Sequence, residues 1–134
     1  MQKSIVLTEE QKQILLKHAS DCAPNESCAV LFGTNESGKN IVKEVFLTEN
    51  IKSSPVSFRI SADETIKAHK LAEEKKLEIV GIFHSHPNSD AYPSTTDEED
   101  MDLNPYAWII YSGETKKMKA FVLQDRIVEI PIIT

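Results

Sequence analysis

The segment that most restricts the fold of this chain is a nearly unbroken apolar run at residues 77–86, LEIVGIFHSH. Its length and its branched side chains are typical of a strand that is buried on both faces. Such a strand needs a covering layer on each side of its sheet. The run therefore predicts a central sheet covered by helices, and its end carries two histidines, His84 and His86.

The rest of the chain alternates between helical and strand patterns. Residues 8–23 predict a helix with a capping box between Thr8 and Gln11, and residues 61–76 predict a second helix capped by Ser61 and Glu64. Strands are expected at residues 27–33, 40–50, 56–60, 106–113, 117–124 and 126–133, and a short acidic helix is expected after residue 94. The fold class is therefore α/β, a mixed sheet flanked by helices.

Both longer helices are expected to carry one apolar side. On the first helix the recurring residues are Ile14, Leu15, His18, Ala19 and Cys22, and on the second they are Ala62, Thr65, Ile66, His69 and Ala72. His69 is interpreted as a border or packing residue rather than a ligand.

Length and composition set limits on function. The 134 residues suit one domain, residues 1–134, and the net charge of -6 without a basic stripe argues against a nucleic-acid partner. No apolar stretch is long enough to span a bilayer, and the start lacks the apolar core of a signal peptide, so no membrane partner and a cytoplasmic location are expected. Cys22 and Cys28 lack the CxxC spacing and are interpreted as two small thiols.

The two histidines are well placed to bind a metal ion. Alternate residues of a strand share a face, so His84 and His86 point the same way. A catalytic zinc ion typically takes three protein ligands and keeps a fourth position for water. Asp97 can be the third ligand, because the turn-rich stretch before it can fold back on the strand and a residue among 94–96 can cap a helix that holds it. The acids that follow Asp97 are interpreted as the solvated face of that helix.

Such an ion would lower the pKa of its water toward about 7, and a hydrolase would also need a group that takes up the proton. The spacing of the acids does not choose this group. A purely structural histidine pair is the alternative that residue types alone leave open.

The segment HSHPNSDAYPSTTD resembles the metal signature of the JAMM (MPN+) metalloprotease family, His-x-His-Pro followed by Pro-Ser-x-x-Asp. The matching residues are His84, His86, Pro87, Pro93, Ser94 and Asp97. Upstream, NESCAVLFG is similar to the family's first strand, Glu-x-Cys-Gly-x-Leu-x-Gly. There Glu26, Cys28, Leu31 and Gly33 match, and Ala29 replaces a glycine.

The resemblance implies a three-layer JAMM/MPN fold, like that of cytidine deaminases, with one Zn²⁺ bound by His84, His86, Asp97 and water. It implies that Glu26 acts as general base and then acid, and that Ser94 donates a hydrogen bond to the oxyanion. The implied activity is that of a zinc isopeptidase cutting after the C-terminal tail of a ubiquitin-like β-grasp protein, to release it from a lysine or another amine. The sequence does not set the oligomeric state.

Three alternatives compete with this reading. The first is a peptidase that processes a sulfur-carrier protein, and the second is a non-catalytic MPN-type binding module. The intact Glu26 and Ser94 argue against the binding module. The third is a zinc deaminase, which needs His-x-Glu and Pro-Cys-x-x-Cys, and this chain has neither motif.

Overall fold

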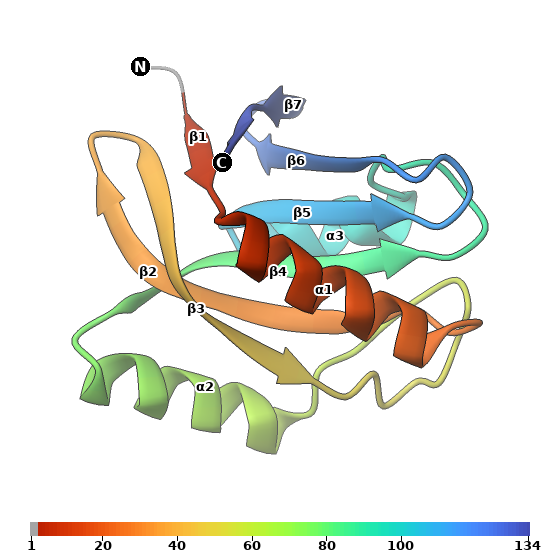
Figure 1. Ribbon diagram of the computed structural model, residues 1–134, viewed down its shortest axis with the longest axis horizontal. Coiled ribbons are helices and arrows are strands. Elements are labelled where there is room, and N and C mark those ends of the chain that lie inside the picture. The colour runs from red at the N-terminus through yellow and green to blue at the C-terminus, as the bar shows by residue number, and fades with distance from the viewer. Residues whose placement is uncertain (1–2) are drawn as a thin grey trace.

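The computed structural model describes residues 3–134, and they form an eight-stranded mixed sheet with helices on both faces (Figure 1). The helices are α1 (Glu9–Cys22), α2 (Ala62–Glu74) and α3 (Thr95–Leu103). The strands are β1 (Ser4–Val6), β2 (Cys28–Glu36), β3 (Lys39–Thr48), β4 (Glu78–His86), β5 (Ala107–Ser112), β6 (Met118–Leu123), β7 (Ile127–Ile130) and β8 (Ile132–Ile133). Their order across the sheet is β7-β6-β5-β4-β2-β3-β1-β8. The predicted α/β fold with a mixed sheet is confirmed.

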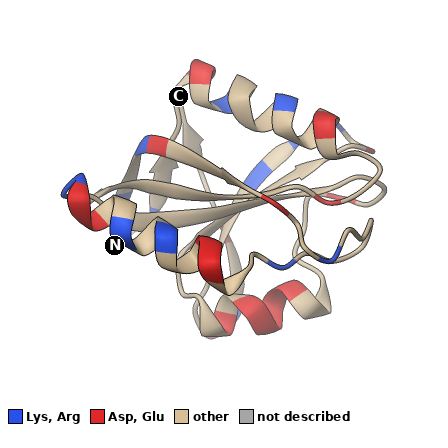
Figure 2. Cartoon of the chain, turned by 90° about the horizontal axis from the view of Figure 1, so that it is seen from below, with Lys and Arg blue, Asp and Glu red and all other residues tan. Residues whose placement is uncertain are grey.

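The fold has three layers. Helix α1 lies on one face of the sheet, and α2 and α3 lie on the other, as the view along the sheet shows (Figure 2). One buried cluster includes Leu15 of α1, and a second, on the opposite face, includes Ala68 and Ala72 of α2 and Met101 of α3. No helix among residues 3–134 is long and apolar enough to cross a membrane.

Strand β4 lies inside the sheet, as its apolar sequence predicts. It pairs antiparallel with β2 and parallel with β5, and it is buried from Val80 to His86. Cys28 of β2 is opposite His84 in this register. The segment just before β2, which contains Glu26, therefore runs beside the end of β4 that carries the histidines.

The two longer helices begin where the sequence predicts. Thr8 and Gln11 form the predicted capping box of α1, and the Ser61 hydroxyl accepts a hydrogen bond from the Glu64 amide at the start of α2. The Glu64 carboxylate instead accepts a hydrogen bond from the Glu49 amide, so it does not complete a capping box.

The predicted apolar side of α2 is wrong in part. Ala72 is buried as expected, but its buried partner is Ala68, whereas Thr65, Ile66 and His69 are exposed. On α1, Leu15 and Ala19 are buried while Ile14 is exposed. The small alanines let α2 lie close to the sheet, so packing distance rather than side-chain hydropathy decides which side faces inward.

Two predicted strands differ from the structure. Residues 56–60 were expected to form a strand because apolar and polar residues alternate there, but they are an extended segment without a strand partner. The predicted strand 126–133 is two strands, β7 and β8, because Pro131 separates them and the chain continues to the opposite edge of the sheet. The two residues of β8 form a strand because they pair with β1, which itself has just three residues.

Candidate metal centre

Three possible ligand atoms meet at the end of β4. The Nε2 atoms of His84 and His86 are 3.0 Å apart, and each lies 3.0 Å from Oδ2 of Asp97. All three residues are buried. The structure thus brings together the histidine pair and the aspartate that the sequence singles out.

The protons of this cluster indicate a place for a cation. His86 Nδ1 lies 2.8 Å from the carbonyl oxygen of Asp90, which can only accept, so Nδ1 carries the proton. In neutral His86 the Nε2 lone pair therefore points at a carboxylate oxygen, which is unfavourable unless a positive charge lies between them. An outer hydrogen bond that fixes the tautomer of this kind is usual for histidines that bind metals.

The spacing also suits zinc. Ligand atoms at about 2.0–2.1 Å from a tetrahedral zinc ion lie roughly 3.3 Å from one another. The 3.0 Å sides of this triangle fall a few tenths of an ångström below that value. The atoms would need to separate only slightly to bind the ion, so the residues present fit it.

The pKa shifts of the cluster follow from burial and from these contacts. Burial lowers the pKa of His84 and keeps this imidazole neutral, as a metal ligand must be. Burial alone would lower the pKa of His86 too, but its bonds to Asp97 and to the Asp90 carbonyl outweigh burial and raise it. Burial would raise the pKa of Asp97, but the two histidine contacts hold it well below its usual range.

Glu26 lies next to the triangle. It is buried, its Oε2 lies 4.0 Å from His86 Nε2, and its Oε1 has no hydrogen-bond partner among residues 3–134. Burial raises its pKa to about 8, although the nearby His86 counteracts this and Asp97 adds to it. A buried carboxyl group with a raised pKa beside a candidate metal site is a typical catalytic acid–base group, and a bound cation would lower this pKa and favour the carboxylate that a base requires.

Glu26 could also be taken for the third ligand, because its carboxylate and the two histidine nitrogens lie within 4.8 Å of one another. Asp97 fits that role better, since its Oδ2 lies 3.0 Å from both nitrogens whereas Glu26 is 4.0 Å from the nearer one. A separation of that size suits contact through a water molecule.

Ser94 lies at the start of α3 and forms a capping box with Asp97. The Ser94 amide donates to Asp97 Oδ2 over 2.9 Å, and the Asp97 amide donates to the Ser94 hydroxyl over 3.0 Å. The hydroxyl is used as an acceptor here, so its own proton can point outward toward a substrate. The acids Glu98 and Glu99 are exposed on the same helix, and α3 is the helix with the acidic run at the bottom of Figure 2.

The sequence interpretation missed two side chains at the site. Phe58 stacks on His84 with ring centroids 4.7 Å apart, and Trp108 meets the same imidazole edge-on at 5.6 Å. Phe58 comes from the extended segment after β3, and alternation of apolar residues was its sole signal. The hydrogen bond between His86 and Asp90 uses the main-chain oxygen of Asp90, so no residue type in the sequence indicates it.

A groove of about 370 Å³ borders the site between α2, α3 and the extended segment. Phe58 and Trp108 belong to its walls, so the rings that contact His84 also line the groove. Lys52 and Arg59 contribute positive charge to it, and α3 contributes Glu99 and Asp100.

Comparison with known proteins places this arrangement in a family. The sequence profile of the prokaryotic homologues of the JAB domain matches residues 8–124. A desampylase from Pyrococcus furiosus is 34% identical over 123 residues, which cover 92% of this chain and 84% of the relative. A CysO-cysteine peptidase from Mycobacterium tuberculosis is 31% identical over 93 residues, which cover 69% of this chain and 62% of the relative.

Solved structures agree with this match. The solution structure of a Desulfitobacterium hafniense protein has a TM-score of 0.86 and 32% sequence identity, and the alignment covers 96% of this chain and 91% of the other. Together with the sequence profile and the desampylase relative, this match confirms the resemblance to the JAMM family. The chain belongs to the prokaryotic homologues of the JAB domain.

Proposed function

We propose that the protein is a zinc isopeptidase that hydrolyses the bond after the C-terminal tail of a ubiquitin-like β-grasp protein and releases it from a lysine or another amine. The observation that supports the proposal most strongly is the position of Glu26. Its carboxyl group is buried, and its Oε2 lies 4.0 Å from His86 Nε2, one of the three possible ligand atoms that meet at the end of β4. The desampylase and the CysO-cysteine peptidase among its relatives support a hydrolase that acts on protein conjugates.

We assign the metal ligands to His84, His86 and Asp97. Zinc held there would supply a water molecule of lowered pKa and would polarise the scissile carbonyl. Glu26 would take a proton from the attacking water as the C–O bond forms, and would deliver it to the nitrogen of the departing amine as the C–N bond breaks, so bonds and protons balance. The Ser94 hydroxyl donates a hydrogen bond to the oxyanion.

The extended segment at residues 56–60 offers a way to bind a thin tail. One side of this segment is already hydrogen-bonded. The Ser57 carbonyl accepts from Asn50 Nδ2, and the Arg59 amide donates to Asn50 Oδ1. The Arg59 carbonyl accepts from the Ile51 amide. In an extended chain the alternate residues point the other way, and the backbone of Phe58 forms no hydrogen bond within residues 3–134. We propose that the tail adds as a strand along this edge, which would bring its scissile carbonyl beside His84, His86 and Asp97.

Cleavage of purified fusions between ubiquitin-like domains and a reporter tests this function. Wild-type protein should release the reporter, whereas Glu26→Gln should keep its zinc and lose at least about a hundredfold in kcat, the contribution usual for a general base. His84→Ala should lose zinc and activity together. The exposed acid Glu98 provides a matched control, and Glu98→Gln should cleave as the wild type does.

Two outcomes would reject parts of the proposal. Cleavage by Glu26→Gln at the wild-type rate would show that another group is the base. Failure of the wild-type protein to bind zinc at any concentration would reject the metallopeptidase as a whole.

A second candidate is a peptidase that acts on a sulfur-carrier protein, which the CysO-cysteine peptidase relative supports. The same assay separates the two candidates when sulfur carriers joined to cysteine are included beside lysine-linked conjugates. We place either activity in the cytoplasm, because Cys22 and Cys28 are both free thiols, as is usual in a reducing compartment.

A further inference from the structure

A pair of buried serines lies at the end of β4 on the side away from the histidines. Ser85 stands between His84 and His86, so its side chain points toward the face that α1 covers. Ser27 directly follows Glu26. Both serines are buried, and their hydroxyl oxygens are 2.9 Å apart. Neither side chain takes part in the reaction proposed above.

The hydrogen bonds between these residues differ from those of a regular antiparallel pair, in which each N–H donates to the carbonyl oxygen of the other residue. The Ser85 amide does donate to the Ser27 carbonyl, over 3.1 Å. The Ser27 amide, however, donates to the Ser85 hydroxyl, over 2.8 Å. The Ser85 hydroxyl oxygen has thus replaced a main-chain oxygen in the last pair of hydrogen bonds between β4 and the segment that leads into β2.

Glu26 lies between this Ser27–Ser85 contact and the loop that contains Asn50 and Ser54. The Glu26 amide donates to the Ser54 carbonyl over 2.8 Å, and its carbonyl accepts from Asn50 Nδ2 over 3.0 Å. The ligand triangle is held independently, by β4 and by the start of α3. The distance from Glu26 to the triangle therefore depends on the Ser27–Ser85 contact and on the loop.

We propose that Ser85 is a positioning residue for Glu26: by holding the Ser27 amide, its hydroxyl sets the separation between the Glu26 carboxyl group and the histidine pair. This inference rests on the proposed function. The separation of 4.0 Å leaves Glu26 beyond direct hydrogen bonding to His86 and within reach of a water molecule between them. Misplacing a catalytic group by about 1 Å can cost roughly a hundredfold in rate.

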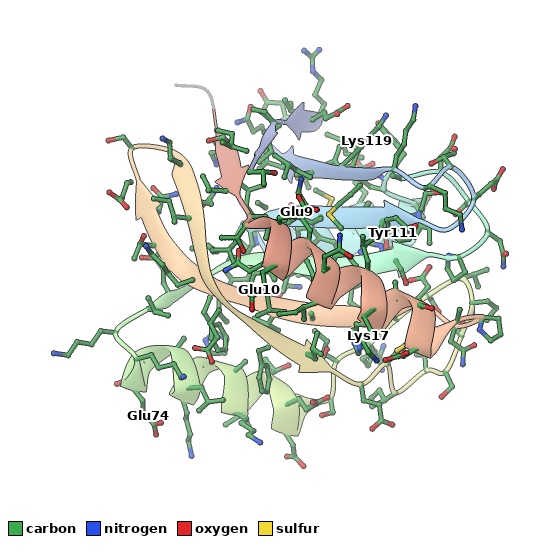
Figure 3. The ribbon with its side chains drawn as sticks, in the orientation of Figure 1. Glu9, Glu10, Lys17, Glu74, Tyr111 and Lys119 are labelled. Carbon is green, nitrogen blue, oxygen red and sulfur yellow. The ribbon has the colours of Figure 1, made fainter. Side chains whose placement is uncertain are left out.

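The test uses Ser85→Ala, which removes the hydroxyl, and Ser85→Thr, which keeps it. A cavity of about 340 Å³ borders Ser85 beneath α1, with Leu16, Ala19 and Tyr111 in its walls, so the added methyl group of threonine has space. Tyr111 is labelled beside α1 in Figure 3. Thr48→Val is the matched control for losing a buried hydroxyl, because Thr48 donates to the Cys28 carbonyl over 2.9 Å on the other side of β2.

For each variant, kcat and KM are measured on the fusion substrate, and zinc affinity is measured by competition with a chelator. We expect Ser85→Ala to lower kcat about a hundredfold with KM and zinc affinity unchanged within about threefold. Ser85→Thr should restore most of kcat, and Thr48→Val should keep it. Wild-type kcat in Ser85→Ala, or an equal loss in Thr48→Val, would overturn the inference.

A crystal structure of each variant provides a readout that does not depend on activity. The distance from Glu26 Oε2 to His86 Nε2 should change in Ser85→Ala and be kept in Ser85→Thr; an unchanged distance in Ser85→Ala would overturn the inference. Absence of activity in the wild-type protein would instead reject the proposed function, and the distance would still decide the role of Ser85.

Discussion

The stability of the metal-free protein depends on a single residue, Glu26, and on whether its carboxyl group holds a proton. Burial raises its pKa from 4.5 to about 8, so between these pH values the folded state keeps a proton that the unfolded state releases. The folded state then binds more protons than the unfolded state, and stability falls as the pH rises through this window.

Glu26→Gln removes this titration. Without metal, the variant should match the wild type at about pH 4.5 and should be the more stable of the two above about pH 8. Urea denaturation in the presence of a chelator, repeated across this range, measures the difference. Glu98→Gln, at an exposed position, should show no such trend. A difference between Glu26→Gln and the wild type that does not vary with pH would contradict the prediction.

Ser94 combines a structural and a proposed catalytic role, and two substitutions can separate them. Ser94→Ala loses both the capping oxygen and the proton, so it should cost about 1 kcal/mol of stability and a hundredfold or more in kcat. Ser94→Asp keeps a capping oxygen without a proton to donate, so it should stay near wild-type stability with kcat as low as that of Ser94→Ala. Thermal unfolding and steady-state kinetics check both, and a Ser94→Asp variant that retains wild-type kcat would rule out the oxyanion role.

At the scale of elements, the segment between β3 and α2 is organised by one side chain. Asn50 Nδ2 donates to the carbonyls of Glu26 and Ser57, and its Oδ1 accepts from the amides of Lys52 and Arg59, all at 3.0–3.1 Å. The Asn50 side chain thus uses its full hydrogen-bonding capacity, and it joins Glu26, the proposed general base, to the segment proposed to hold the substrate tail.

Asn50→Asp keeps the shape of the side chain but replaces both donors with acceptors. We expect it to lower the free energy of unfolding by about 3 kcal/mol, because two carbonyl oxygens then face a carboxylate. It should also raise KM, since the extended segment loses its support. Asn104→Ala, which removes a single exposed contact to the Asp100 carbonyl, should cost well below 1 kcal/mol. Urea denaturation compares the two, and equal losses would contradict the role of Asn50.

The sequence predicts a helix or strand well when its pattern depends on residues within that element. It predicts poorly when contacts with other parts of the fold decide the outcome. The buried β4 and the cap of α1 follow from local residues, and both are confirmed. The segment 56–60 has a strand pattern, but Asn50 rather than a neighbouring strand takes up its backbone bonds on one side. For α2, the sheet beneath selects Ala68 over the larger Ile66, which the helical pattern cannot reveal.

The candidate site divides in the same way. The histidine pair and Asp97 could be predicted from spacing along one stretch, because strand alternation and a turn suffice to bring them together. Glu26 could be chosen among the many acids by family resemblance alone, since it meets the histidines across the β2–β4 pairing. Phe58 and the Asp90 carbonyl could not be predicted, because ring stacking and main-chain contacts leave no distinctive pattern.

Zinc bound at the proposed site should stabilise the molecule as a whole, since the proposed ligands come from β4 and α3 and the unfolded chain does not hold them together. At a free zinc concentration a hundred times Kd, the gain should be about 2.7 kcal/mol. Thermal unfolding with and without a chelator measures it. His84→Ala should show no difference between the two conditions, and a wild-type Tm that does not respond to the chelator would contradict the zinc site.

One oxygen atom joins the start of α3 to the candidate metal centre. Asp97 Oδ2 accepts the Ser94 amide that begins the helix and also faces both histidine nitrogens. If zinc binds here as proposed, its loss would leave Asp97 Oδ2 facing the lone pairs of the two histidine nitrogens, so helix α3 (Thr95–Leu103) should open more often in the metal-free protein. If zinc binds as proposed, an added protease should therefore cut the metal-free protein within this helix faster than the zinc-loaded protein.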